Sequence, residues 1–588
     1  MLKRIIPPLL FLAFAWFVVS NDDAKTIIAG IAIFLIGMHY MEDGFKLFSG
    51  GALENILEKF TSTTLKAIGT GFLATAVVQS SSLVSVIIIS FLSAELIGLT
   101  QAVGVVFGSN IGTTATAWLV SAFGLKIKIA HYALPMLIFG VIMQFSKHIT
   151  YKGLGSVLIG LGFIFLGIAY MKEGFETLKQ GLDLAEYAMA GYLGVFVYIL
   201  FGAIATIVIQ SSSATMAIII TALATGQIDY INALSLAIGA NIGTTVTAAL
   251  GALASNKNGK RLAVAHFIFN IITGLFAVIF IYQLKDLVDF LAPLLLISSN
   301  DDAMRLALFH TIFNVAGVLI VAPFVVYLVR YLETLFREEA RGRGRAKYLT
   351  SEVMEIPATA LAALRKETIH LYDKSLEAIV HAMNLHRTEI FSDADIDEVV
   401  EHSNAPIKID VDKVYQQELK SLYGEIIQYA SISQNYMDQE GNNEIYELKL
   451  TARNIIEMVK DVRELQRNLN FYSKGHNTVT IEEYDKLRAQ LIAVLRKIQH
   501  VREFTGDEED ILTEIEVQRD IVNENEIKLN HEVDSLIREN KIDPNTASSL
   551  INDIGFAHSI SKKLLSSAIT LWVKDQEIKE LGDEYGYE

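Results

Sequence analysis

Two short polar runs interrupt apolar sequence in this chain, and their residue types could bind an anion. Gln79-Ser80-Ser81-Ser82 lies in one apolar stretch, and Gln210-Ser211-Ser212-Ser213 lies in another. In hydrocarbon each amide or hydroxyl must find a hydrogen-bonding partner, so four polar side chains in a row are costly. Because the arrangement occurs twice, we predict a two-sided binding site at membrane depth.

The chemistry of these runs suits an oxyanion together with a hard cation. Serine hydroxyls are small uncharged donors, and a helix that begins after Ser82 or Ser213 would point its free N–H groups at the same place. Alkali-metal ions need oxygen ligands and little formal charge. The predicted sodium ligands are therefore Gln79, Gln210, Asn110, Thr113, Thr114, Asn241, Thr244 and Thr245. The alternative is that the Ser and Thr residues only allow close helix packing or bond back to carbonyl groups.

The composition places the chain among membrane proteins. Of its 588 residues 52% are hydrophobic, the mean hydropathy is +0.38, and several apolar runs approach the roughly 20 residues that span a bilayer. Most of the charge follows about Arg337, so a membrane half precedes a charged half. The absence of cysteine excludes disulfides, thiolate catalysis and cysteine-ligated metal. We find no nucleotide loop or hydrolytic constellation and expect no enzyme activity.

Three sequence matches at nearly one offset indicate an internal duplication. The serine motif recurs after 131 residues (210 − 79), and Asn110-Ile-Gly-Thr-Thr114 returns at the same offset (241 − 110) as Asn241-Ile-Gly-Thr-Thr245. A third set recurs after 130 residues (167 − 37): Gly37, Tyr40, Met41, Gly44 and Phe45 match Gly167, Tyr170, Met171, Gly174 and Phe175.

Each repeat is predicted to have the same layout. A helix (26–48; 153–176) precedes a segment interrupted by the serine motif (63–95; 192–223), and helices follow at 101–122 and 232–253 and then from near Ala130 and Ala265. Basic residues concentrate near 3–4, 147–152, 257–261 and 330–347. The positive-inside rule places all four clusters in the cytoplasm if each interrupted segment is a re-entrant hairpin. Each repeat then crosses three times, which inverts the second repeat. We predict eight spans plus two hairpins, with both termini cytoplasmic.

At these residues the chain resembles the type II sodium–phosphate cotransporter family. The duplicated Gln-Ser-Ser-Ser motif within inverted halves is that family's signature, and the resemblance covers roughly residues 26–330. It implies an all-α polytopic transporter that moves inorganic phosphate with sodium by alternating access. It also implies phosphate contacts at Ser80, Ser81, Ser82, Ser211, Ser212 and Ser213, with Gln79, Gln210, Thr244 and Thr245 lining substrate or sodium sites.

One position departs from the family pattern. The family often follows the first serine motif with threonine, whereas this chain continues Leu83-Val84-Ser85. The second motif keeps a hydroxyl at Thr215, which we include among the phosphate-binding residues, but its repeat equivalent is Val84. One sodium or phosphate contact is therefore expected to be missing. No Arg or Lys lies near either motif in the sequence, so the counter-charge for phosphate must come from ions and helix ends.

The second half is predicted to be a helical domain that follows a basic linker. Apolar residues recur at helical spacing over 351–386, 408–437, 441–472, 481–504, 508–540 and 545–580, which predicts two three-helix bundles. This half resembles a PhoU-like domain, a module associated with bacterial phosphate regulation. Glu457 and Asp461 match one copy of that family's metal-binding signature, but Gly555 and Ser559 replace the acidic residues of the other copy. The alternative for Glu457 and Asp461 is a solvated helix face.

We therefore predict a multi-pass protein of the bacterial inner membrane with five parts. These are a retained first helix (1–25), repeat 1 (26–150), repeat 2 with the last span (151–335), a linker (336–350) and the PhoU-like domain (351–588). The predicted function is sodium-dependent phosphate transport under cytoplasmic regulation, with sodium ions and no organic cofactor. Expected partners are phosphate, sodium and the lipid bilayer, with no nucleic acid, and a homodimer stays open. The alternatives are a carrier of another oxyanion, a phosphate exporter, or a phosphate sensor that does not transport.

Overall fold

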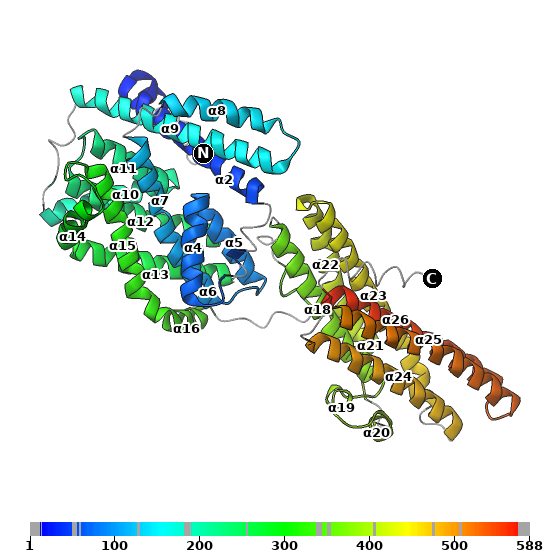
Figure 1. Cartoon of the computed structure of the whole chain (residues 1–588). Helices are drawn as coiled ribbons and strands as arrows, with labels where there is room; N and C mark the ends of the chain where they lie inside the picture. Colours follow the sequence, from blue (N-terminus) through cyan, green and yellow to red (C-terminus); the bar gives the residue numbers. More distant parts are fainter. Residues whose placement is uncertain are drawn as a thin grey trace. The chain divides into compact units, whose positions relative to one another are not determined.

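The computed structural model shows an all-helical chain in two compact units, residues 1–338 and 339–588 (Figure 1). It describes residues 12, 14–49, 56–57, 60–125, 130–181, 189, 191–253, 257–336, 344–349, 354, 356–403, 407–472, 477–504 and 508–573. No strand occurs in these residues. The predicted fold class is confirmed, and the unit boundary falls inside the predicted basic linker.

The first unit contains every helix that the repeat analysis predicted within these ranges. Residues 14–20 are helical, and the rest of the predicted first helix lies outside the described residues apart from residue 12. The following elements are α2 (Asp22–Ser49), α4 (Thr64–Val78), α5 (Ser81–Ser93), α6 (Leu99–Gly112), α7 (Thr114–Trp118), the π-helix η1 (Leu119–Gly124), α8 (Ala130–Gln144), α9 (Ile149–Gly181), α10 (Gly191–Ile209), α11 (Ser212–Ala224), α12 (Tyr230–Leu253), α13 (Lys257–Ile279), α14 (Ile281–Leu294), α15 (Asp302–Val321), η3 (Ala322–Phe324) and α16 (Val325–Leu335).

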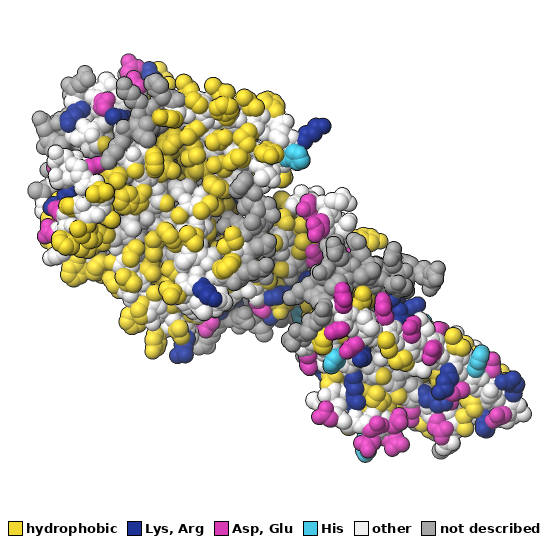
Figure 2. Space-filling view, viewed as in Figure 1, with side chains coloured by type: hydrophobic (Ala, Val, Ile, Leu, Met, Phe, Trp, Pro, Cys, Tyr) yellow, Lys and Arg dark blue, Asp and Glu magenta, His cyan; other side chains and the backbone are white. Residues whose placement is uncertain are grey.

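The surface of the first unit has the character of a lipid-facing protein. Figure 2 shows hydrophobic side chains over most of the face that it presents, and charged side chains gather on the second unit. On α8 alone Leu134, Ile138, Phe139 and Ile142 are each more than half exposed, which is unfavourable in water and favourable in hydrocarbon. By length and composition, six helical stretches of the described residues could cross a membrane. One of them, Gly191–Ile209, is the first arm of a hairpin, so the count of eight spans stays a prediction.

Helices α2 and α9 demonstrate the inverted relation between the repeats. They are equivalent in sequence, yet they pack antiparallel through glycines spaced by seven residues. A Cβ atom on Gly30 would stand 2.8 Å from the carbonyl oxygen of Gly167, and one on Gly37 would stand 2.7 Å from that of Gly160. By the repeat offset of 130, Gly160 is the equivalent of Gly30 (160 − 30) and Gly167 is the equivalent of Gly37 (167 − 37). The second contact is therefore the repeat equivalent of the first. Such a symmetric antiparallel contact is what an in-plane two-fold axis produces.

The first interrupted segment is a helical hairpin. Helix α6 runs parallel to α4, because Gly104 lies beside Thr64 at the start of α4, whereas Gly112 lies beside Thr75 near its end. Helix α5 leaves the end of α4 and leads to the start of α6. It must therefore run back along the hairpin, and the turn between its arms falls at the serine motif.

The second interrupted segment repeats this geometry. A Cβ atom on Gly108 of α6 would stand 1.9 Å from the carbonyl oxygen of Ile68, and one on Gly239 of α12 would stand 2.0 Å from that of Ile199. Both pairs differ by the offset of 131 (239 − 108; 199 − 68). Glycine is required at these positions because the backbones of α4 and α6, and of α10 and α12, touch. The second hairpin, α10 and α11, therefore lies on α12 as the first lies on α6.

The second unit contains the six predicted helices as α18 (Pro357–Ala382), α22 (Lys420–Ser433), α23 (Gln439–Tyr472), α24 (Thr478–Glu503), α25 (Glu508–Arg538) and α26 (Pro544–Trp572). The additional short elements are α19 (Arg387–Ile390), α20 (Ile396–His402), α21 (Val411–Val414), η4 (Tyr415–Leu419) and η5 (Gln434–Tyr436). Helices α18, α22 and α23 pack together, as do α24, α25 and α26, and the pairing of α23 with α26 joins the two sets. All six share one continuous hydrophobic core.

A buried carboxyl group lies between α23, α24 and α26. The Asp553 carboxyl group accepts hydrogen bonds from the Tyr484 hydroxyl (2.6 Å) and the Asn468 amide (3.2 Å). Burial raises the pKa of Asp553 to about 6, against the lowering effect of those two hydrogen bonds. This acid therefore makes the stability of the second unit depend on pH.

Candidate functional site

The turn of each hairpin is built by the same sequence of residue types, Gln-Ser-Ser-Ser. Gln79 ends α4 in the left-handed backbone region at φ 59°, and Gln210 follows α10 at φ 60°. The next serine caps the second arm, since Ser80 accepts from the Leu83 N–H and Ser211 from the Ala214 N–H, each at 3.2 Å. A left-handed conformation is unfavourable for a residue with a side chain and often marks functional sites. Its occurrence at the same position of both motifs ties the strain to the motif.

The serine motifs lie at helix N-termini, although each helix begins inside its motif rather than after it. Helices α5 and α11 begin at Ser81 and Ser212, so the free N–H groups of their first turns and the positive ends of their dipoles lie at the hairpin tips. Such a helix end attracts an anion. The N-termini of α5 and α11 therefore make the tips suitable for binding an oxyanion, and no cationic side chain is needed.

The two tips meet through one residue that the sequence analysis did not identify. The Thr116 hydroxyl on α7 donates to Gln79 Oε1 at 2.7 Å and lies 3.3 Å from Ser213 Oγ. The side chain is buried, with 4% of its surface exposed. One hydroxyl thus connects the first motif with the second. The available signal was the third hydroxyl residue of each Asn-Ile-Gly-Thr-Thr-x-Thr run, Thr116 and Thr247, which also differ by 131 (247 − 116).

The predicted phosphate-binding residues differ in exposure between the repeats. Ser212, Ser213 and Thr215 are buried, Ser80, Ser81 and Ser211 are partly buried, and Ser82 is exposed. The Thr215 hydroxyl donates to the Ser211 carbonyl at 2.9 Å, which stabilises the first turn of α11. The structure brings Ser213 and Gln79 together, and it holds the two halves of the site in unlike states.

The Asn-Ile-Gly-Thr-Thr motifs lie within or at the end of long helices rather than at their starts. The hydroxyls of Thr113, Thr114, Thr244 and Thr245 each donate to a carbonyl three residues earlier, and their oxygens keep lone pairs that could bind a cation. Asn110 and Asn241 are buried and hydrogen-bonded to histidines on other helices. Gln79 offers Oε1 to Thr116, and Gln210 is exposed. The sodium assignment of these residues stays a prediction.

Comparison with known proteins shows which family this arrangement is similar to. The family model described as Na+/Pi-cotransporter matches residues 33–173 and 188–298, which contain both hairpins and both Asn-Ile-Gly-Thr-Thr motifs. The first unit of the chain is similar to the Na+/Pi-cotransporter family. The matched residues all lie in the first unit, so the similarity rests on that unit.

Individual relatives agree with this similarity. The putative inorganic phosphate export protein YjbB of Escherichia coli is 26% identical over 363 residues, which cover 61% of this chain and 64% of that protein. The chain thus spans slightly less than two thirds of that relative. The uncharacterized protein YqeW of Bacillus subtilis is 29% identical over 45% of this chain and 84% of its own. The mouse sodium-dependent phosphate transport protein 2C is 42% identical over 85 residues, 14% of each chain. No solved structure matches the chain.

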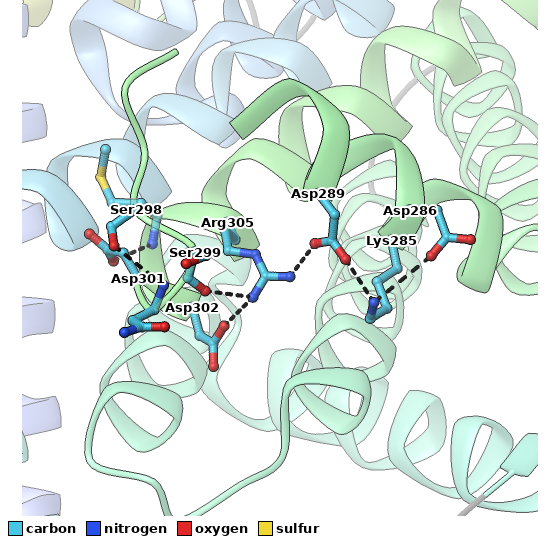
Figure 3. A network of polar contacts seen from close by, with 10 residues as sticks. Lys285, Asp286, Asp289, Ser298, Ser299, Asp301, Asp302 and Arg305 are labelled. Carbon is cyan, nitrogen blue, oxygen red and sulfur yellow. Dashed lines mark hydrogen bonds and ion pairs between the residues drawn. The ribbon is translucent and has the colours of Figure 1, made fainter. Parts of the chain in front are cut away.

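The first unit also contains a charged network, which involves none of the serine-motif residues. Arg305 at the start of α15 bonds Asp289 of α14 and Asp302 (2.6 Å), and Lys285 bonds Asp289 at 2.8 Å (Figure 3). The Arg305 guanidinium also lies 4.5 Å from the ring centroid of Tyr230 on α12. These contacts fix α15 against α14 and α12. The described hydrogen bonds of the serine motifs, in contrast, run to uncharged groups.

Glu457 and Asp461 of the second unit form ion pairs with basic side chains. Lys563 Nζ lies 2.9 Å from Asp461 and 3.5 Å from Glu457, and Arg453 bonds Glu457 at 2.8 Å. The Ser559 hydroxyl donates to Asp461 at 3.0 Å. Within the described ranges, no group of three or more histidines and carboxylates is arranged around a common point. The predicted metal site stays untested, and the ammonium of Lys563 already neutralises part of its charge.

Proposed function

We propose that this chain transports inorganic phosphate across a membrane with sodium as the coupling ion, by alternating access between two inverted repeats. The observation that carries the proposal is the Thr116 contact, which joins Gln79 of one hairpin tip to Ser213 of the other. A receptor needs no such two-sided site, whereas a carrier must expose one site to each side in turn. The family and the named phosphate relatives support the substrate.

Sodium supplies the charge that the site lacks. Burying a phosphate anion without counter-charge is prohibitive, and the tips bring helix ends and hydroxyls but no cationic side chain among their described contacts. Co-bound sodium ions would offset the anion and so couple the two fluxes. The amide and hydroxyl oxygens of Gln79, Thr113, Thr114, Thr244 and Thr245 are the proposed ligands.

We place the protein in a bacterial inner membrane with both termini cytoplasmic, following the basic clusters. The second unit is proposed as a PhoU-like regulatory domain. Within that unit, the backbone N–H groups of Lys347 and Tyr348 both donate to the fully buried Glu367 carboxylate at 2.7 Å.

Uptake of labelled phosphate into proteoliposomes tests this function. We expect uptake that requires an inward sodium gradient and that stops when potassium replaces sodium. Binding of phosphate without flux would contradict transport and favour a sensor. The Escherichia coli relative is named as an exporter, so the reverse experiment, efflux from phosphate-loaded vesicles with each sodium gradient, decides the direction.

A further inference from the structure

Two helices of the first unit carry a second, shorter duplication. His266-Phe-Ile-Phe-Asn270 lies on α13, and His310-Thr-Ile-Phe-Asn314 lies on α15, at an offset of 44 residues (310 − 266). Each histidine and asparagine pair is four residues apart and therefore shares a helix face. All the residues of these faces lie inside the membrane unit, where each buried amide needs a partner.

The predicted layout made α13, which continues from near Ala265, the repeat equivalent of α8, which begins near Ala130, but this pairing is wrong because α8 packs on α9 whereas α13 packs on α5 and α6. The structure instead relates α13 and α15 by the same pseudo-two-fold symmetry as the repeats. Helix α13 packs against α5 and α6, and α15 packs against the equivalent helices α11 and α12. Thr273 of α13 lies against Gly317 of α15, which is its own equivalent at the offset of 44 (317 − 273). A residue meets its equivalent where a two-fold axis passes, so the axis runs between these helices.

One part of the duplicated motif obeys the symmetry. His266 Nε2 lies 3.2 Å from Asn110 Oδ1, and His310 Nε2 lies 3.3 Å from Asn241 Oδ1. The amide oxygen only accepts, so Nε2 carries the hydrogen in both rings. His266 thereby connects α13 to the Asn-Ile-Gly-Thr-Thr motif of α6. His310 connects α15 to the equivalent motif of α12.

The other part of the motif breaks the symmetry. Asn241 Nδ2 donates to Asn314 Oδ1 at 2.7 Å, and Asn314 Nδ2 donates to the His310 carbonyl at 2.8 Å. In the equivalent place, Asn110 Nδ2 turns back to the carbonyl of Val106 in its own helix at 2.8 Å. Both amide atoms of Asn270 are then buried without a hydrogen-bonding partner, although the residue is only 1% exposed.

The hairpin tips are unlike in the same conformation. Ser82 is exposed, while its equivalent Ser213 is 7% exposed and contacts Thr116. In a carrier built from inverted repeats, exchanging the conformations of the two halves produces the state that opens to the other side. The unpaired amide of Asn270 and the paired amide of Asn314 are therefore expected to exchange their hydrogen-bonding states as well.

We propose that Asn270 and Asn314 are the two alternative acceptors of an amide switch that accompanies alternating access. In the present state Asn241 donates a hydrogen bond to Asn314, and the Asn270 amide has no hydrogen-bonding partner. In the opposite state Asn110 Nδ2 donates to Asn270 Oδ1, while Asn241 turns back to its own helix at Ala237, the equivalent of Val106 (237 − 106 = 131). His266 and His310 hold Asn110 and Asn241 in both states and are positioning residues.

The test measures the conformation rather than the flux. The chain has no cysteine, so S82C and S213C each introduce a single thiol whose reaction with a charged, membrane-impermeant thiol reagent reports exposure to water. N314L removes the acceptor of the present state, and N270L, its matched counterpart, removes the acceptor of the opposite state. We expect N314L to slow labelling at position 82 and to speed labelling at position 213, and N270L to do the reverse, each by about fivefold or more.

Labelling rates that are unchanged, or that move in the same direction in both variants, would overturn the switch. If N314L does not give a monodisperse protein, the pair N241C and N314C replaces it. A mercuric ion that bridges these thiols should keep a third thiol at position 213 protected under saturating sodium and phosphate, and reaction there would overturn the proposal.

The switch rests on the proposed alternating access, and the two can fail separately. Opposite labelling shifts, together with no phosphate flux in the parent chain that keeps both serines, would refute the transport function and leave the switch. Flux without opposite shifts would refute the switch alone.

Discussion

Replacing Thr116 by valine should impair phosphate transport, because the change removes one hydroxyl and preserves the side-chain shape. That hydroxyl donates to Gln79 Oε1 at 2.7 Å and approaches Ser213 Oγ at 3.3 Å, in a position only 4% exposed. Leaving a buried acceptor without its donor costs about 1–3 kcal/mol. If the connection between the tips is made in the state that carries phosphate, kcat/KM for uptake should fall by about 5- to 150-fold.

The assay is sodium-driven uptake of labelled phosphate into proteoliposomes, over a range of phosphate concentrations. T116S keeps the hydroxyl and should retain at least most of the wild-type activity. T221V is the matched control, because the buried Thr221 hydroxyl bonds only the Ala217 carbonyl of its own helix at 2.7 Å. The reasoning is refuted if T116V and T221V have the same kinetic constants.

Three further substitutions test the packing, the pH dependence and the ion pairs. G108A should destabilise the first unit, because its Cβ would stand 1.9 Å from the Ile68 carbonyl oxygen. The control G69A places a Cβ that meets nothing within 4 Å and should be neutral or stabilising. Equal melting temperatures of the two variants would contradict this account. The pKa of Asp553 is raised to about 6, so its contribution favours folding at low pH and is lost as the pH rises from about 4 to about 6. D553N should remove this pH-dependent loss of stability and stabilise the second unit at pH 7 by at most about 3 kcal/mol. Denaturant melts that give the wild type and D553N the same dependence of stability on pH would disprove the prediction. K563M should raise the affinity for Mn2+ by about tenfold or more, because it removes the ammonium beside two carboxylates; titration calorimetry that finds no gain would exclude a latent metal site there.

Much of the architecture could be predicted from the sequence, because repetition and periodicity are local signals. The offset of 131 located both hairpins and both Asn-Ile-Gly-Thr-Thr motifs, and the Gln-Ser dipeptide predicted where each helix breaks. Four polar side chains in hydrocarbon force a turn whose groups can find partners. The six long helices of the second unit followed from apolar spacing, whereas α19 and α20 were missed because helices of four and seven residues carry too few periods.

The sequence determined which residues recur, and the tertiary structure decided which of them meet. The duplicated run marks Thr116 and Thr247 alike, and only the tertiary structure shows that Thr116 connects the two tips. The pairing of Asn241 with Asn314, and the lack of a partner at Asn270, are likewise invisible in two nearly identical motifs. A repeat encodes symmetry, but a carrier in one conformation must break it, and only the packed structure shows which half holds which state.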